Sequence, residues 1–221
     1  MKTHTLLADD PQAISDAQRL LRQGQVIAFP TDTVYGVGTH AFLPDAVAAL
    51  YAAKDRPMSK AIPVLIARTD HVSRVARAVP AVAWQLAERF WPGDLTIVLP
   101  RAEELPAIVT GGGDTVAVRC PHHPIPLTLM NAIDAPLAAT SANLSGQPPP
   151  TTAHQVAAQL AGRLPLIIDG GDSPGGIPST VVDLSTCPPR LLTTGVVGGH
   201  QRRRVLPDRI DGEQAGTSLP P

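Results

Sequence analysis

The chain reads FPTDTVYGVG from Phe29 to Gly38 and KDRPMSKAIPVLI from Lys54 to Ile66. The apolar run Gln25–Phe29 before the first stretch is typical of a buried strand bounded by Gly24 and Pro30. Hydroxyl groups and glycine backbone N–H groups follow that strand, and open α/β sheets bind their ligands where strands end. The stretch therefore predicts a strand that delivers polar groups to a ligand site.

The second stretch carries a cluster of cations. Lys54 and Arg56 flank one acidic residue, Pro57 restricts the backbone after them, and Lys60 follows before the next apolar run. Three cations in a short loop suit a polyanion, because ammonium and guanidinium groups bind phosphate oxygens through charge-assisted hydrogen bonds. We predict that this loop binds phosphate.

The composition limits the class of protein. With 221 residues and 43% apolar content, the chain can bury one sizeable core. Its 18 basic and 19 acidic side chains nearly cancel, so no overall field indicates a nucleic-acid or membrane partner. Cys120 and Cys187 show no metal-ligand spacing and are typical of reduced thiols. No apolar run has the length of a signal peptide or a membrane span, so we expect a cytoplasmic protein with no membrane partner.

Helical and strand patterns alternate along the chain. Asp10 and Pro11 begin a helix that Gly24 ends, and Pro80 breaks a helical stretch over Asp70–Phe90. Further helices are expected at 45–53, 124–132 and 152–160, and strands at 25–29, 62–67, 95–99, 115–119, 136–140, 166–169, 180–184 and 190–192.

This alternation predicts a single α/β domain over residues 1–206, with flanking helices on one twisted sheet. The strands 95–99 and 115–119 have no helix between them, so the sheet should mix parallel and antiparallel pairs. Residues 207–221 are polar and rich in Pro and Gly, and we expect a disordered tail there.

Polar side chains cluster where the predicted strands end. The clusters are Thr31 and Thr33; Lys54, Arg56 and Lys60; Thr115 and Arg119; Thr140, Ser141 and Asn143; and Ser179 and Thr180. No catalytic triad order, metal-ligand set, Walker motif or GxGxxG accompanies them. Cations, hydroxyls and an amide suit a nucleoside triphosphate together with a small polar metabolite, because phosphoryl chemistry asks mainly for positioning and charge neutralisation.

Seven motifs together resemble the YrdC/TsaC-like threonylcarbamoyl-AMP synthases over about residues 12–195. They are PTDTVYGVG, KDRP, WPGDLTIVL, DTVAVRCPHHP, ATSANLSG, IIDGG and STVVDL. The resemblance implies a mixed sheet lining a concave, positively charged cavity. It also implies that L-threonine, bicarbonate and ATP, with Mg²⁺, are joined to give threonylcarbamoyl-AMP and pyrophosphate. Partner proteins of tRNA modification would then receive the threonylcarbamoyl group.

The resemblance also implies roles for individual residues. Lys54 and Arg56 match the family's KxR element and are the expected catalytic residues, and Ser141 and Asn143 match its SxN element. The residues expected to bind ATP are Arg56, Lys60, Thr115, Ser141 and Asn143. Those expected to bind threonine are Thr31, Arg119 and Ser179, with Arg119 facing the substrate carboxylate. No metal-binding residue is expected.

Three positions depart from the family pattern. Leu65 stands where some members have a threonine-contacting His, and Pro149 where many have Ser. Thr193 replaces an Arg of an LLRPG-like end that reaches the nucleotide in the family. Arg190 would compensate only in a different register, because period-two alternation places residues 190 and 193 on opposite faces of a strand.

Two other classes of function remain open from the sequence. One is a related RNA-binding module with weak or no adenylation activity, which the Thr193 departure keeps open. The other is a carbamoyl-adenylate module of larger hydrogenase-maturation proteins, although the zinc-finger and acylphosphatase-like segments of those proteins are absent from this sequence. The Arg202–Arg204 run is a candidate for a weak RNA contact, but the favoured interpretation is a solvated tail.

Overall fold

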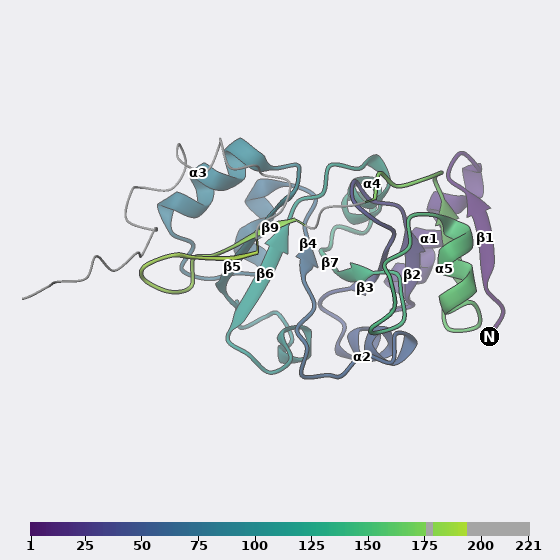
Figure 1. Ribbon diagram of the computed structural model, residues 1–221, viewed down its shortest axis with the longest axis horizontal. Coiled ribbons are helices and arrows are strands. Elements are labelled where there is room, and N and C mark those ends of the chain that lie inside the picture. Colours follow the sequence, from purple (N-terminus) through teal and green to yellow (C-terminus); the bar gives the residue numbers. More distant parts are fainter. Residues whose placement is uncertain (176–178, 194–221) are drawn as a thin grey trace, which may run out of the picture.

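A computed structural model describes residues 1–175 and 179–193, and one sheet of ten strands runs along the longest axis of the molecule (Figure 1). In chain order its elements are β1 (His4–Leu7), α1 (Pro11–Arg22), β2 (Ile27–Phe29), β3 (Gly36–His40), α2 (Pro44–Ala53), β4 (Val64–Leu65), the 3-10 helix η1 (Thr69–Arg74), α3 (Ala81–Phe90), β5 (Leu95–Pro100), the 3-10 helix η2 (Ala107–Thr110), β6 (Thr115–Arg119), α4 (Pro124–Ile133), β7 (Leu137–Ser141), α5 (Ala153–Leu160), β8 (Leu166–Asp169), β9 (Thr180–Asp183) and β10 (Arg190–Thr193).

The strand order is β1-β8-β2-β3-β7-β4-β6-β5-β9-β10. Pairs β1–β8, β2–β8, β4–β6 and β5–β9 are parallel, whereas β2–β3, β3–β7, β4–β7, β5–β6 and β9–β10 are antiparallel. The predicted fold class, a mixed sheet with flanking helices, is therefore confirmed.

Helix ends that depend on a few adjacent residues lie where the sequence predicts them. Asp10 caps α1 by accepting a hydrogen bond from the Gln12 N–H, and Pro11 begins the helix. Gly24 follows the helix with φ +72°, a conformation that glycine adopts at little cost. The predicted break at Pro80 is also found, because η1 ends before it and α3 begins directly after it.

Two strands differ from the prediction. Gly36–His40 forms β3, although its glycines made it resemble a ligand-binding loop. Glycine is needed at Gly38, where a Cβ would lie only 2.9 Å from the Ala138 carbonyl oxygen. The N-terminal strand β1 was not predicted, because HTLL has no clear alternation and lies at the edge of the sheet.

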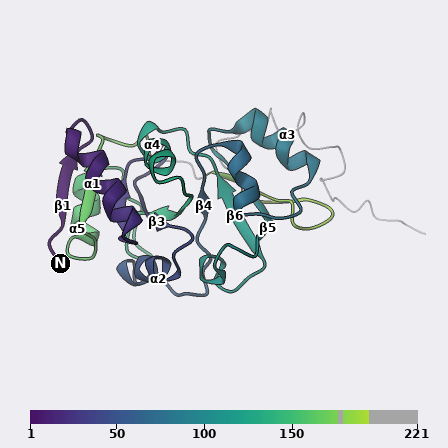
Figure 2. The same cartoon turned by 180° about the vertical axis from the view of Figure 1, so that it is seen from behind.

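The helices cover the two faces of the sheet unequally. On one face, α1 and α4 pack on side chains of β2, β4, β7 and β8, including Phe29, Leu65 and Leu137. On the other face, α2, α3 and α5 pack on alternate residues such as Val37, Val64 and Ile97. Figure 1 shows α4 and α2 on opposite sides of the central strands, and Figure 2 shows α1 with α4 from behind.

The cover by α1 and α4 ends before β6. Leu65 of β4 lies on the face that these helices cover, and its partner Arg119 of β6 lies on the same face. Along β6, Thr115 is exposed, Ala117 and Arg119 are half-buried, and Val116 and Val118 between them are buried. The same face therefore continues over β6, β5 and β9 without a covering helix among the described residues. We call this region the open face.

Some predictions fall on residues that the structure does not describe. Arg202–Arg204 and the expected tail at 207–221 lie outside the described residues, so the domain boundary at 206 stays a prediction. In the part of the chain that is described, no helix has both the length and the apolar character needed to cross a membrane.

The close approach at Gly38 gives a test of this packing. The Gly38→Ala substitution should lower the free energy of unfolding by about 1–3 kcal/mol, because the added methyl meets both the Ala138 carbonyl and the Ala139 side chain. Urea unfolding measures the loss. The control is Gly113→Ala, whose Cβ would meet only the Thr110 carbonyl at 3.3 Å, and it should cost no more than about 0.5 kcal/mol. Equal losses in the two variants would contradict the packing at β3.

Candidate active site

A cavity of about 300 Å³ opens where the cover by α1 and α4 ends. It is lined by Thr31, Thr33, Val34, Tyr35, Gly36, Pro63, Leu65, Thr96, Arg119, Ala139, Thr140, Ser141 and Ser179. Most of the polar groups are hydroxyls, and the single cation is Arg119. A volume of this size suits a small metabolite.

Strand register brings these residues together from distant parts of the sequence. Gly36 of β3 pairs with Phe29 on one side and with Ser141 on the other. The ends of β2 and β7 therefore lie together at Gly36. Leu65 pairs with Arg119 on one side and with Leu137 on the other, so β6 ends beside the beginning of β7. The expected threonine-binding residues Thr31, Arg119 and Ser179 all line this one cavity, as does Ser141.

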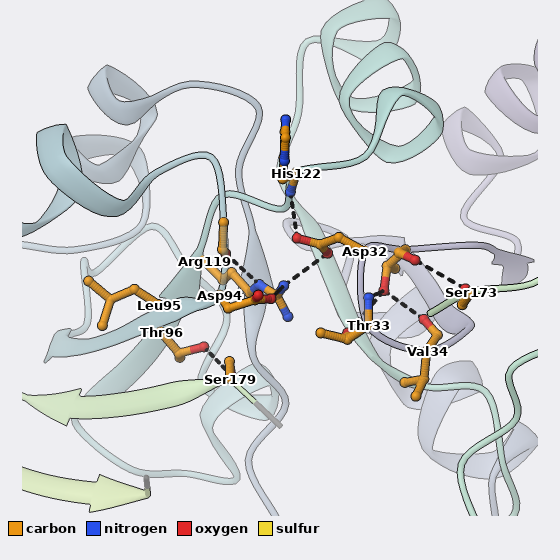
Figure 3. Close-up of polar contacts among 12 residues, drawn as sticks. Asp32, Thr33, Val34, Asp94, Leu95, Thr96, Arg119, His122, Ser173 and Ser179 are labelled. Atoms are coloured by element: carbon orange, nitrogen blue, oxygen red, sulfur yellow. Dashed lines mark hydrogen bonds and ion pairs between the residues drawn. The ribbon is translucent and has the colours of Figure 1, made fainter. Parts of the chain in front are cut away.

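Thr31 forms a compact turn directly after β2. Its hydroxyl donates to the Val34 carbonyl at 2.6 Å and accepts from the Thr33 N–H at 3.2 Å (Figure 3). Its carbonyl accepts a hydrogen bond from the buried Ser173 hydroxyl at 3.0 Å. These bonds satisfy the turn internally and hold the Thr33 side chain at the cavity wall.

Arg119 is held by three groups on two segments. Its Nε donates to the Gly93 carbonyl at 2.9 Å, and its Nη2 donates to Asp94 Oδ1 at 2.6 Å. The same Nη2 lies 2.9 Å from Asp32 Oδ1, as an ion pair without hydrogen-bond geometry (Figure 3). Asp32 is oriented in turn by the His122 N–H, which donates to its Oδ2 at 2.8 Å. The guanidinium is therefore fixed before any ligand arrives.

Burial alters the acid–base properties of groups around this cavity. It raises the pKa of Asp94, and the neighbouring Asp32 charge adds to that effect while Arg119 opposes it. Burial also raises the pKa of the Cys120 thiol to about 11, so that thiol is protonated and inert at neutral pH. Tyr35, with a pKa raised to about 12 chiefly by burial, stays a hydroxyl and donates to the Gly171 carbonyl.

Lys54 is buried, with only 1% of its surface exposed. It follows α2, and its Nζ donates to the carbonyl oxygens of Ser141 and Asn143. Its own carbonyl accepts from the Ser145 N–H at 2.9 Å. Lys54 therefore joins the end of α2 to the loop after β7, where the cavity-lining Ser141 ends the strand.

The other residues expected to bind ATP lie outside the cavity. The Arg56 guanidinium donates to the carbonyls of Lys60 and Ala61 and so closes its own loop, whereas the Lys60 side chain is exposed. Thr115 begins β6 at the end opposite Arg119, roughly 13 Å along the strand. Asn143 is buried and donates to the carbonyls of Leu144 and Gln147, so it organises the loop after Ser141.

The structure corrects the expected orientation of Arg190. Arg190 pairs with Asp183, and Leu191 with Val182, but Thr193 pairs with Val181 because the register shifts between Leu191 and Thr193. Asp183 and Val181 share one face, so Arg190 and Thr193 lie on the same face rather than on opposite ones. Because β9 also pairs in register with β5, this is the open face that carries Thr96 and Arg119.

The other two departures from the family pattern have different surroundings. Leu65 lines the cavity beside Arg119 and gives it an apolar wall where some relatives have a His. Pro149 is exposed in the loop before α5, away from the lining residues.

Sequence reasoning missed three residues of the site, namely Asp32, Asp94 and Thr96. Asp32 stands between two threonines that were noted, and Asp94 precedes a predicted strand. Thr96 shares a hydrogen bond of 2.9 Å with Ser179. Their positions next to motif residues were the available signal. Their roles depend on contacts with Arg119 and Ser179, which are far away in the sequence.

The described residues contain no cluster of three or more His, Cys, Asp or Glu side chains that could hold a metal ion. The carboxylates Asp32 and Asp94 are both paired with Arg119, which lines the cavity. This donor set does not fit a resident Mg²⁺ site of the protein. A magnesium ion that comes with a nucleotide substrate would be carried by the phosphate oxygens.

A model of the Sua5/YciO/YrdC family, described as "Telomere recombination", matches residues 19–195. The Pyrococcus abyssi protein named threonylcarbamoyl-AMP synthase is 47% identical over 190 residues, which cover 86% of this chain and 56% of that protein. The chain thus spans little more than half the length of this relative. A Mycobacterium tuberculosis protein named putative threonylcarbamoyl-AMP synthase is 36% identical over 208 residues, which cover 92% of this chain and 95% of that protein.

The fold also matches solved structures. The crystal structure of P. abyssi Sua5 complexed with L-threonine aligns with a TM-score of 0.87 and 42% sequence identity, over 93% of this chain and 61% of that one.

The buried ammonium of Lys54 gives a pH-dependent prediction. Burial, with a smaller contribution from Arg56, lowers its pKa from 10.5 to about 8. Between pH 8 and 10.5 the unfolded chain holds this proton and the folded chain has lost it, so raising the pH stabilises the folded state. The free energy of unfolding of the wild type, relative to Lys54→Met, should therefore rise across this window by at most about 1.4 kcal/mol per pH unit.

Urea unfolding of both proteins at a series of pH values measures the difference. Lys60→Met serves as the control, because it removes the same charge from an exposed side chain. A difference between wild type and Lys54→Met that stayed constant from pH 7 to 10 would contradict the burial of a charged Lys54.

Proposed function

Because this chain belongs to the Sua5/YciO/YrdC family, we propose that it is an L-threonylcarbamoyladenylate synthase, a nucleotidyltransferase. It joins L-threonine, bicarbonate and ATP, the last as its Mg²⁺ complex, into threonylcarbamoyl-AMP and releases pyrophosphate. The relatives with this name, and the solved relative that binds L-threonine, support the proposal.

One observation carries the proposal. The open face has an arginine and several hydroxyls in a small cavity at one end of β6, and the strand begins with the exposed Thr115 at its other end. Arg119 and Thr115 mark these two ends on β6, roughly 13 Å apart. This separation lets an amino acid in the cavity meet the α-phosphate of a nucleotide whose outer phosphates reach the loop Lys54–Lys60.

We propose for each side chain the role that the family resemblance implies. In the cavity, Thr31, Arg119 and Ser179 bind threonine. The residues that bind ATP are Arg56, Lys60, Thr115, Ser141 and Asn143. The catalytic pair is Lys54 and Arg56, and Lys54 acts by holding Ser141 and the following loop at the junction of the two subsites. Positioning and charge neutralisation are what this reaction requires of the protein.

The proposal extends to the cellular setting. The product is a reactive mixed anhydride, so a protein partner of tRNA modification must take it up soon after release. We place this exchange in the cytoplasm. A direct RNA contact through Arg202–Arg204 belongs to the same proposal, and these residues lie outside the described part of the chain.

The central prediction concerns dependence on substrates. Release of pyrophosphate from ATP should require both L-threonine and bicarbonate, with Mg²⁺ present, in a coupled pyrophosphate assay. L-serine should give a kcat/KM at least about tenfold lower, because it lacks the methyl group that the apolar wall at Leu65 would contact. The Arg19→Gln variant, changed on the exposed surface of α1, is the control and should match the wild type.

Pyrophosphate release that is equally fast without an amino acid would contradict the proposal. No release at all, combined with RNA binding in a gel-shift assay, would support the RNA-binding module instead.

A second prediction concerns Arg190 and Thr193, which the shifted register places on the open face. Arg190 makes no hydrogen bond or ion pair with any described residue, so its guanidinium is available to the nucleotide. Arg190→Ala should weaken ATP binding about tenfold or more, the value expected for one charge-assisted hydrogen bond. Adding Thr193→Arg to that variant should restore the affinity, and L-threonine affinity should stay nearly unchanged throughout.

Calorimetric titration of ATP measures these affinities. The control is Arg89→Ala, which removes an arginine of α3 that stacks on Phe90 and lies outside the open face. If wild type, Arg190→Ala and Thr193→Arg bind ATP equally well, the nucleotide does not approach β10.

A further inference from the structure

Arg119 is held along one edge and is free along the other. Its Nε and Nη2 are engaged by Gly93, Asp94 and Asp32. Its remaining terminal nitrogen, Nη1, has no partner among the described residues, although the side chain lines the cavity. A ligand carboxylate can therefore meet Arg119 only at this free edge.

The charges around Arg119 do not balance. Two carboxylates face one guanidinium within 2.9 Å. His122 donates its backbone N–H to Asp32, and the side chains of His122 and His123 interact with Asp94 and Asp32, respectively, only through space. The three side chains are 11%, 13% and 25% exposed for Arg119, Asp32 and Asp94, so water compensates them only in part. The group has a formal charge of −1 and lacks one cation.

The two carboxylates differ in their exposure and in their hydrogen bonds. Asp32 Oδ1 is buried beneath Arg119 and has no hydrogen-bond donor, and its Oδ2 accepts from His122. Asp94 is the more exposed of the two, and its Oδ2 has no partner among the described residues. Burial is the main cause of the raised pKa of Asp94; the Asp32 charge adds to it, and Arg119 and His122 oppose it. Neither carboxylate is among the residues that line the cavity, so both act on a ligand at Arg119 through their charge, Asp94 from the more exposed position.

The excess of negative charge around Arg119 favours one class of ligand over another. A simple carboxylate at Arg119 would bring a third negative charge beside two others, and repulsion would oppose its binding. An α-amino acid carries its ammonium one carbon away from its carboxylate, so the same molecule supplies the missing cation. We propose that Asp94, supported by Asp32, selects the substrate by its α-ammonium group, so that the cavity binds a zwitterion and rejects the same acid without the amine.

This inference rests on the proposed function, because it concerns the amino-acid subsite of that reaction. Its alternative is that the two carboxylates only hold Arg119 in place. The two cases differ in one ratio. A holding role affects every carboxylate ligand alike, whereas recognition of the ammonium affects only ligands that carry one.

The test compares L-threonine with (R)-3-hydroxybutanoate, the same carbon chain without the amine, by calorimetric titration into the full chain. The wild type should bind L-threonine at least about 100-fold more tightly. Asp94→Asn keeps the shape and an oxygen acceptor for Arg119 but removes the charge. It should weaken L-threonine binding by about 10- to 100-fold and leave the hydroxybutanoate equal or tighter, so that the ratio falls to about tenfold or less.

Asp32→Asn provides a second variant and should lower the same ratio by a smaller factor, because its free oxygen is buried under Arg119. Circular dichroism confirms that each variant is folded. If both ligands weaken by the same factor in the folded variants, the ratio is unchanged, and the carboxylates only position Arg119. If the wild type binds the two ligands equally, the inference also fails while the proposed function stands. If the wild type binds no L-threonine, the proposed function itself fails.

Discussion

On one face of the sheet the covering helices end at β4, and this determines where a ligand site can lie. On the face that carries Phe29 and Leu65, α1 and α4 bury the strands up to β4. Beyond β4 the same face continues over β6, β5 and β9 with no described helix over it, whereas the opposite face stays covered by α3. Arg119 can remain accessible in an apolar strand because its neighbours Val118 and Cys120 are buried on the other side. Both the cavity and the approach to the cationic loop depend on this arrangement.

Two cations, the buried Lys54 and the half-buried Arg119, hold the site together in different ways. Lys54 has no carboxylate partner among the described residues, and its ammonium donates to the backbone carbonyls of Ser141 and Asn143. Arg119 has two carboxylate partners, Asp32 and Asp94, for its single positive charge. A buried charge is costly unless it is well paired, so each arrangement restricts the neighbouring backbone to one geometry. The first fixes the loop that joins the two proposed subsites, and the second fixes the charge of the amino-acid cavity.

The parts of the fold that could be predicted are those with local causes. Asp10, Pro11 and Gly24 delimit α1 because capping and a positive φ are properties of a few adjacent residues. The mixed sheet could be expected because 95–99 and 115–119 are joined without an α-helix. In contrast, β3 was not predicted, because its glycines made it resemble a loop. Gly38 is needed for a close contact with β7, which lies far away in the sequence. The register shift that turns Arg190 toward the open face has no local signature either.

The sequence alone determined the alternating α/β pattern, the family to which the chain belongs, and the kinds of side chain that serve the site. These follow from periodicity, capping and short motifs, each of which acts over a few residues. Only the tertiary structure decided that Lys54 is buried while Lys60 is exposed, that Asp32 and Asp94 meet at Arg119, and that Arg190 shares a face with Thr193. The physical reason is that burial and charge pairing depend on strands brought together by pairing across the sheet, and no short stretch of sequence contains both partners.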